Sequence, residues 1–250
     1  TTKQLPLGYY HEDGIRKYRY AHVAMTSASR GRVLQQTPSA GQWIPLSGLY
    51  ATGQFKSCMN GFGNAAGDLW VKVFAASGLT GDKFVDGFFD VLSGSGAGYS
   101  YQIDTYETGA TARATKIRLC EPLVVKLSTN THAKIRVNPY WGLKLPTAKC
   151  SYGSATTLEL SGTTPLGATA FNFTASGFGF IQSRGPGVAH ANAALSPGIH
   201  IGAVVSGKLS TAMVKRTSAQ IGTSSLIILG RLRTKAAAAN KFCQVDWQFE

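Results

Sequence analysis

The sequence has few acidic residues: 12 Asp and Glu stand against 25 Lys and Arg in a chain of 250 residues. The charged fraction is 15%, whereas an average soluble domain has about 25%. So little charge does not favour long solvated helices. The formal charge of +13 indicates a long-range preference for polyanions or acidic protein surfaces, without deciding between the two.

Cysteine is also scarce, and its spacing excludes the common cysteine sites. The sequence contains no C-x-x-C pair and no zinc-finger pattern of cysteine with histidine. We therefore expect free, buried thiols and no bound metal. The four cysteines are Cys58, Cys120, Cys150 and Cys243.

Long apolar runs are missing as well. No run approaches the roughly 18 residues that characterise a membrane-spanning helix, so no membrane partner is expected. The first six residues, TTKQLP, lack the basic and then apolar layout of a signal peptide. We therefore expect a soluble protein that is made in a cytoplasm.

Recognisable catalytic motifs are absent from the sequence. There is no His-Glu-x-x-His pattern and no Gly-x-Ser-x-Gly nucleophile elbow, and the five histidines form no motif; they are His11, His22, His132, His190 and His200. Asp82, Asp86 and Asp90 are spaced by four, but the glycines and aromatics between them favour a turn and a strand over an aligned helix face. Asp104 and Glu107 could act as the two carboxylates of a glycosidase only if the fold happened to place them on either side of a substrate bond, which the sequence does not show. We expect no catalytic residue, no cofactor and no enzyme activity.

What the sequence does contain is a series of strand and turn signals. Segments 69–74, 115–119, 123–127 and 134–137 have the apolar patterns of strands. The glycine-rich segment 94–98, GSGAG, lacks the Lys-Ser/Thr ending of a phosphate-binding loop, so we interpret it as a turn. The sequence predicts an all-β fold, a barrel or sandwich, with an extended N-terminal arm (residues 1–30) and two β-rich lobes (residues 31–146 and 147–250).

Two sets of residues are predicted to contact a partner. The N-terminal segment carries tyrosines, whose large rings and polar tips suit contacts between subunits; an edge strand packed on its own core would look the same. On the central strands, Lys and Arg alternate with Ile, Leu and Val, which places positive charge on one face of a sheet. The predicted contact residues are Tyr9, Tyr10, Tyr18, Tyr20, Arg113, Lys116, Arg118, Lys134 and Arg136.

Two consecutive segments resemble a recurring pattern in head-associated structural proteins of tailed phages. Residues 81–91, GDKFVDGFFDV, and 94–103, GSGAGYSYQI, are similar to the strand, glycine turn and G-Y-x-Y-x-I strand of that pattern. Shorter motifs follow in the expected order: LCEPL at 119–123, NPY at 138–140, FIQSRGP at 180–186 and IG at 221–222. The chain thus resembles the decoration, or capsid cement, proteins. Its charge of +13 departs from that family, many of whose members are acidic or neutral.

The resemblance implies binding rather than catalysis. It implies a virion protein, made in the host cytoplasm, whose homo-oligomers, trimers above all, sit on the lattice of the major capsid protein. Three further functions stay open: a tail, baseplate or fibre-attachment protein, a β-barrel that binds single-stranded nucleic acid, and a carbohydrate-degrading or carbohydrate-binding head appendage. The nucleic-acid function is not favoured, because the tyrosines proposed as stacking platforms would equally pack a core; they are Tyr99, Tyr101, Tyr106 and Tyr140. A carbohydrate-binding appendage would use Trp43, Trp70, Trp141 and Trp247.

Overall fold

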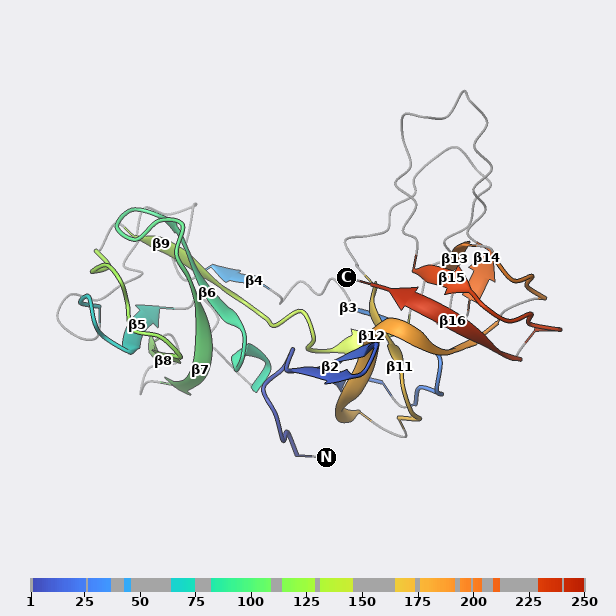
Figure 1. Ribbon diagram of the computed structural model, residues 1–250. Coiled ribbons are helices and arrows are strands. Elements are labelled where there is room, and N and C mark those ends of the chain that lie inside the picture. Colours follow the sequence, from blue (N-terminus) through green and yellow to red (C-terminus); the bar gives the residue numbers. More distant parts are fainter. Residues whose placement is uncertain are drawn as a thin grey trace, which may run out of the picture. The chain divides into compact units, whose positions relative to one another are not determined.

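The chain folds into two units, each built on its own β-sheet (Figure 1). The discontinuous unit joins Thr1–Pro38 to Tyr140–Glu250, and the inserted unit is Ser39–Pro139. The computed structural model describes residues 2–25, 27–36, 43–45, 64–74, 82–108, 114–128, 131–145, 165–173, 176–191, 194–198, 200–203, 209–211, 229–239 and 241–249. The predicted all-β class is confirmed: in these ranges, the one helical element is the 3-10 turn η1 (Asp82–Phe84).

This division differs from the expected arm and two consecutive lobes. The boundary expected after residue 146 lies near the point where the chain re-enters the discontinuous unit, but residues 1–38 belong to the same unit as the C-terminal half. The expected extended arm is largely a hairpin of β1 (Tyr10–Asp13) and β2 (Arg16–Val23), and β2 pairs along β12 (Gly177–His190). Pairing between strands so distant in sequence leaves no local pattern, so sequence reasoning could not find it.

The discontinuous unit contains a sheet of ten strands (Figure 1). The strand order is β1-β2-β10-β3-β11-β12-β16-β15-β13-β14, and β2 also pairs with β12. The five strands β2, β10, β3, β11 and β12 therefore close into a ring, which removes free edges from that part of the sheet. The other strands of the unit are β3 (Val33–Gln36), β10 (Leu143–Lys144), β11 (Pro165–Thr169), β13 (His200–Ala203), β14 (Leu209–Thr211), β15 (Gly230–Leu232) and β16 (Phe242–Gln248).

Strand β12 is the longest of the described strands and joins the ring to the rest of the sheet. Its N-terminal half pairs with β2 and its C-terminal half pairs with β16. The change of partner occurs at a kink, where Gly185 has a positive φ of 88° and the register with β2 shifts between Gln182 and Arg184. The Gln182 side chain stabilises the kink, because its Nε2 donates to the carbonyls of Arg184, Gly185 and Pro186 at 3.0–3.1 Å.

Two apolar clusters form the core of the discontinuous unit. One cluster combines buried side chains of the ring strands with Ala28 and Phe173, which form an isolated bridge; its members are Ala21, Val23, Ala28, Leu34, Leu143, Phe173 and Ile181. The second cluster surrounds Trp247, which is 1% exposed, and includes Val33 and Val245. Because Val33 and Leu34 point to opposite faces of β3, this strand is covered by apolar side chains on both sides.

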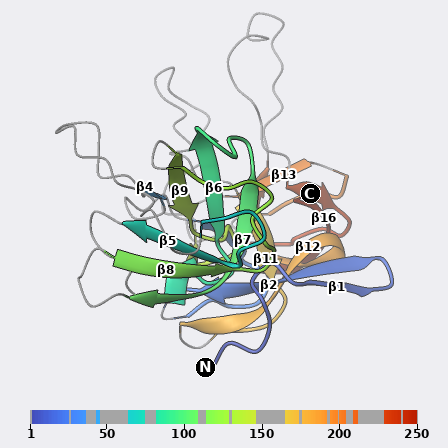
Figure 2. The same cartoon turned by 90° about the vertical axis from the view of Figure 1, so that its left-hand side faces the viewer.

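The inserted unit contains a six-stranded antiparallel sheet with the order β4-β9-β6-β7-β8-β5. Figure 2 shows β5, β8 and β7 side by side, with β6 next to β9. The bounds are β4 (Trp43–Pro45), β5 (Trp70–Phe74), β6 (Phe88–Ser93), β7 (Ser100–Thr108), β8 (Ala114–Leu119) and β9 (His132–Arg136).

The predicted glycine turn joins β6 to β7, as the sequence indicated. Gly94, Gly96 and Gly98 all have positive φ, between 79° and 92°. The strand predicted at 123–127 is wrong: this segment is irregular, and Leu123 and Leu127 are buried while their backbone N–H groups donate to carbonyls outside any strand ladder, at 2.9 Å. The spacing of apolar residues therefore predicted correctly which side chains are buried in this segment, but it did not predict that the segment lacks a paired strand.

Candidate anion-binding site

The positive charge of the chain is concentrated in one unit. The discontinuous unit holds 16 of the 25 Lys and Arg but only 5 of the 12 Asp and Glu, which gives it a formal charge of +11. The inserted unit holds the remaining 9 basic and 7 acidic residues, a formal charge of +2. The positive long-range field of the chain therefore comes mainly from the discontinuous unit.

The basic residues predicted on the central strands have acidic neighbours. Arg118 on β8 lies 3.2 Å from the Asp104 carboxylate, and Lys116 lies 3.5 Å from Glu107 on the paired strand β7. Side chains in these two pairs are 46–58% exposed, so the pairs add little stability. They nevertheless reduce the positive field of this sheet face, which the sequence pattern alone could not show.

Arg136 on β9 is held more firmly. Its Nε donates to Asp90 Oδ2 at 3.1 Å, and its guanidinium lies 4.5 Å from the centre of the Phe88 ring. Lys134 is half-buried on the same strand, and Arg113 lies outside the described residues. The structure thus places Lys116, Arg118, Lys134 and Arg136 on one sheet, where Arg136 contacts the neighbouring residues Asp90 and Phe88.

The four predicted contact tyrosines differ in exposure. Tyr9 and Tyr10 are 47% and 36% exposed, Tyr18 is half-buried and Tyr20 is buried. The Tyr10 ring lies 5.0 Å from the Arg19 guanidinium, and its hydroxyl donates to Glu12 at 2.6 Å, which raises the pKa of Tyr10. Tyr9 and Tyr10 are therefore the members of this set that a partner could reach most directly.

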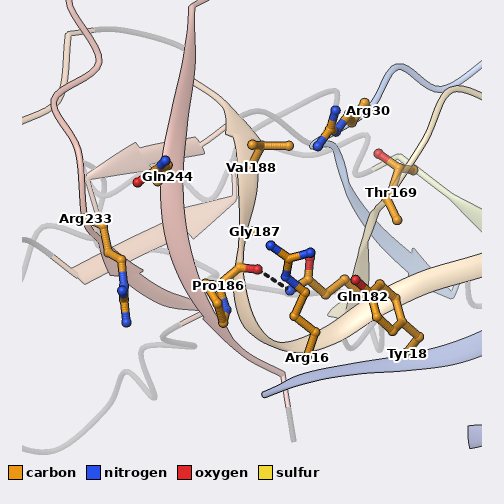
Figure 3. A pocket seen from close by; sticks show the side chains of 11 residues that line it. Arg16, Tyr18, Arg30, Thr169, Gln182, Pro186, Gly187, Val188, Arg233 and Gln244 are labelled. Carbon is orange, nitrogen blue, oxygen red and sulfur yellow. Dashed lines mark hydrogen bonds between the residues drawn. The ribbon is translucent and has the colours of Figure 1, made fainter. Parts of the chain in front are cut away.

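A pocket of about 210 Å³ lies beside the kink of β12. Three arginines from separate segments line it: Arg16 begins β2, Arg30 precedes β3, and Arg233 follows β15. Figure 3 shows these side chains gathered around the kinked part of β12. We call it the arginine pocket; its other lining residues are Tyr18, Thr169, Ala170, Gln182, Pro186, Gly187, Val188 and Gln244.

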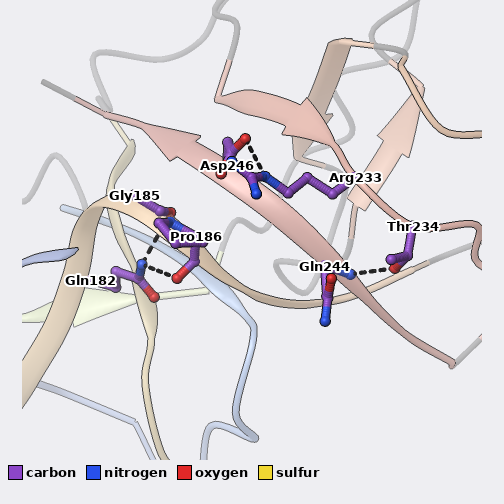
Figure 4. A network of polar contacts seen from close by, with 7 residues as sticks. All are labelled: Gln182, Gly185, Pro186, Arg233, Thr234, Gln244 and Asp246. Atoms are coloured by element: carbon purple, nitrogen blue, oxygen red, sulfur yellow. Dashed lines mark hydrogen bonds and ion pairs between the residues drawn. The ribbon is translucent and has the colours of Figure 1, made fainter. Parts of the chain in front are cut away.

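One wall of the arginine pocket is held by polar contacts (Figure 4). The Arg233 guanidinium is paired with the Asp246 carboxylate of β16, and the Arg233 backbone N–H donates to the Gln244 carbonyl at 2.8 Å. The Gln244 N–H in turn donates to the Thr234 hydroxyl at 2.8 Å. Within the described part of the chain, no carboxylate lies within 4 Å of the Arg16 or Arg30 guanidinium. Arg16 and Arg30 therefore line the pocket without an ion pair in the described residues.

Comparisons with family models, curated proteins and solved structures find no match to this chain. The arginine pocket is therefore interpreted from its own geometry. The sequence reasoning missed Arg16, Arg30 and Arg233, because they come from separate segments of the chain. They line one pocket because β12 pairs with β2 and β16, and because Gly31, next to Arg30, is hydrogen-bonded to Thr169 of β11 and His190 of β12.

Aromatic side chains form a row on β2 and β12 of the same unit. The His22 ring stacks on Trp141 at 4.1 Å between centroids and lies 4.8 Å from Phe178. Tyr20 lies 6.1 Å from Phe178 and 5.4 Å from Phe180. These rings cover one another, so their faces are largely occupied. The row is therefore better suited to covering the sheet than to stacking on the bases of a nucleic acid.

Two of the aromatic residues considered for stacking on a base or a sugar are part of the cores. Tyr101 is 3% exposed, stacks on Tyr99 and accepts a hydrogen bond from the Val124 N–H at 3.1 Å. Trp247 is buried in the core of the discontinuous unit. Neither Tyr101 nor Trp247 can therefore offer its ring to a base or sugar.

The two described cysteines differ from each other. Cys243 is buried, its thiol donates to the Ala189 carbonyl, and burial raises its pKa to about 11. Cys120 is exposed, which contradicts the expectation of buried thiols for this residue; Cys58 and Cys150 lie outside the described residues. In the described ranges, no group of three or more His, Cys, Asp or Glu side chains is placed to hold a metal ion. The same ranges contain no helix long and apolar enough to cross a membrane.

Proposed function

We propose that this chain is a non-enzymatic structural protein of a tailed-phage head, which binds the lattice of the major capsid protein as a decoration protein. The observation that carries the proposal is the division of charge, because the discontinuous unit has +11 and the inserted unit +2. A basic unit can dock on an acidic shell, while a near-neutral unit can contact other copies of the chain without strong repulsion. The proposed oligomer is a trimer.

The hairpin of the inserted unit also supports the proposal. The described residues of the segments that resemble phage head proteins, 82–91 and 94–103, contribute η1, most of β6, the glycine turn and the start of β7. They therefore form one continuous structural feature. A decoration protein needs only a modest interface per copy, because binding to the assembled shell and not to its dissociated subunits stabilises the shell by mass action, and oligomers bind with avidity.

The test is the addition of purified protein to expanded heads that lack decoration. We expect binding that saturates at a stoichiometry fixed by the lattice and weakens as salt is added. Replacing Arg16 and Arg30 by Gln, in the discontinuous unit, should weaken binding more than replacing Lys116 and Arg118 in the inserted unit. A larger loss of binding for the Lys116 and Arg118 variant would indicate that the central strands make the contact. Absence of binding at every salt concentration would refute the proposal.

Single-stranded nucleic-acid binding is the second candidate, because a ring of five strands with a strong positive charge is also compatible with that function. The mutual stacking of the aromatic row is the reason that it ranks lower. Filter binding across a salt series separates the two functions, since a dedicated site retains affinity at physiological salt and a diffuse charge does not. A tail or baseplate role would give no binding to heads but would give binding to tails in the same assay.

A further inference from the structure

We propose that the arginine pocket is a receptor for a carboxylate, the side chain of an Asp or Glu that the acidic partner protein presents. This inference rests on the proposed function and names the chemistry of its contact. Arg16 and Arg30 are the residues assigned to hold the carboxylate, and Arg233 with Asp246 forms the fixed wall beside them.

The size of the pocket limits its ligand. Its volume is about 210 Å³, below the roughly 300–1,000 Å³ of sites that enclose drug-sized ligands and cofactors. A single acidic side chain, or one small oxyanion with a few waters, fits such a volume, whereas a nucleotide does not. The pocket therefore suits one group at the tip of a partner residue.

The charges of the pocket favour an anion that forms paired hydrogen bonds. A guanidinium presents two parallel N–H groups, which match the two oxygens of a carboxylate and give charge-assisted, directional contacts. Arg233 already makes an ion pair with Asp246, through its Nε. Because Asp246 neutralises Arg233, the guanidinium groups of Arg16 and Arg30 are the ones that can bind an external anion.

The backbone that carries the two arginines is held in place before a ligand arrives. The Arg30 N–H donates to Asn172 Oδ1 at 2.7 Å, and the Thr169 hydroxyl donates to the Ser29 carbonyl at 2.7 Å. Arg16 lies in the antiparallel ladder of β1 and β2, opposite Asp13. A site held in this way loses less conformational entropy on binding than one on a free loop.

A protein carboxylate is favoured over a nucleic-acid phosphate by what surrounds the pocket. Binding along a nucleic acid uses a basic track with open aromatic faces for successive bases. In this unit, Tyr20 and His22 of β2 are in ring contact with Phe178 and Phe180 of β12 and with Trp141, and the pocket lining offers three arginines. This arrangement suits a single charged side chain.

The experiment compares a fluorescent poly-glutamate peptide with a labelled oligothymidylate of equal charge, by anisotropy at physiological salt. The double variant Arg16→Gln with Arg30→Gln is set against Arg184→Gln with Arg231→Gln. The control pair removes the same charge from exposed arginines of the same unit that do not line the pocket. Circular dichroism and thermal melting verify that both variants fold.

We expect the pocket variant to bind poly-glutamate about tenfold or more weakly, because two charge-assisted contacts are lost, and the control variant about threefold or less. Equal losses would overturn the inference, because they indicate diffuse attraction. Tighter binding of oligothymidylate that depends on Arg16 and Arg30 would also overturn it, in favour of a phosphate. If the protein fails to bind heads but shows the expected poly-glutamate result, the proposed function falls and the pocket assignment stands.

Discussion

Replacing Gly185 by Ala should strongly destabilise the discontinuous unit, because this residue is where β12 changes partners. Gly185 has a φ of 88°, and a Cβ added there would overlap the carbonyl oxygen of Ile15 and lie 3.1 Å from the Cα of Arg16. Both contacts are with backbone atoms, which cannot rotate away as a flexible side chain could. Relief of the overlap requires a shift of the β1–β2 hairpin or of β12 itself.

Gly14 provides a matched control for the size of the effect. It also has a positive φ, 59°, but an added Cβ meets no heavy atom of the described residues within 4 Å. Gly14→Ala should therefore lower the free energy of unfolding by about 1–2 kcal/mol, because alanine is strained in the left-handed conformation. Gly185→Ala should lower the free energy of unfolding by the same amount and by about 1–3 kcal/mol more, because its Cβ also overlaps the backbone of Ile15. The sum, about 2–5 kcal/mol, is a large part of the typical 5–15 kcal/mol of a domain.

Urea unfolding followed by tryptophan fluorescence measures this difference, since Trp247 is buried in the same unit. The transition of the discontinuous unit has to be fitted by itself, because the inserted unit can unfold separately. Equal destabilisation by the two variants, within about 0.5 kcal/mol, would refute the reasoning. Gly185→Ala should also weaken poly-glutamate binding, because the kink forms one side of the arginine pocket.

Two further predictions concern titratable groups. Burial lowers the pKa of His22, and its Nδ1 is buried without a hydrogen-bond partner among the described residues. Below about pH 6.5, the unfolded state therefore binds more protons than the folded state, so the stabilisation is fully present above this pH and is lost as the pH decreases. Thermal melting should show a smaller loss of stability at low pH for His22→Phe than for the unmodified protein. An equal loss would contradict the assignment to His22. In a variant with Cys58 and Cys150 replaced by Ser, a thiol reagent should modify Cys120 in the native protein and Cys243 only after unfolding. Native modification of both thiols would show that Cys243 is accessible.

Much of the local structure of the inserted unit could be predicted from the sequence. The strands near residues 69–74, 115–119 and 134–137 and the glycine turn at 94–98 correspond to β5, β8, β9 and the β6–β7 connection. These features depend on alternation and on the positive φ that glycine adopts, and both are properties of short segments. The segment 123–127 has similar apolar spacing but forms no strand, because spacing reports burial and not the presence of a pairing partner.

The candidate site could not be predicted in the same way. The sequence indicated positive charge on central strands, where the structure supplies the carboxylates of Asp90, Asp104 and Glu107 as neighbours. Arg16, Arg30 and Arg233 are far apart in the sequence and gave no signal. The tertiary structure brings them to one pocket: β12 pairs with β2 on one half and β16 on the other, and Gly31, next to Arg30, is hydrogen-bonded to Thr169 and His190.

The sequence by itself determined the all-β class, the excess of positive charge and the position of the main glycine turn, because composition and short-range periodicity are sufficient for these properties. The tertiary structure decided how the chain divides into units, which unit carries most of the positive charge, and which arginines line the same pocket. Those properties depend on contacts between residues as distant as Arg16 and Arg233, whose proximity results from strand pairing and burial across the whole unit, and not from any local pattern.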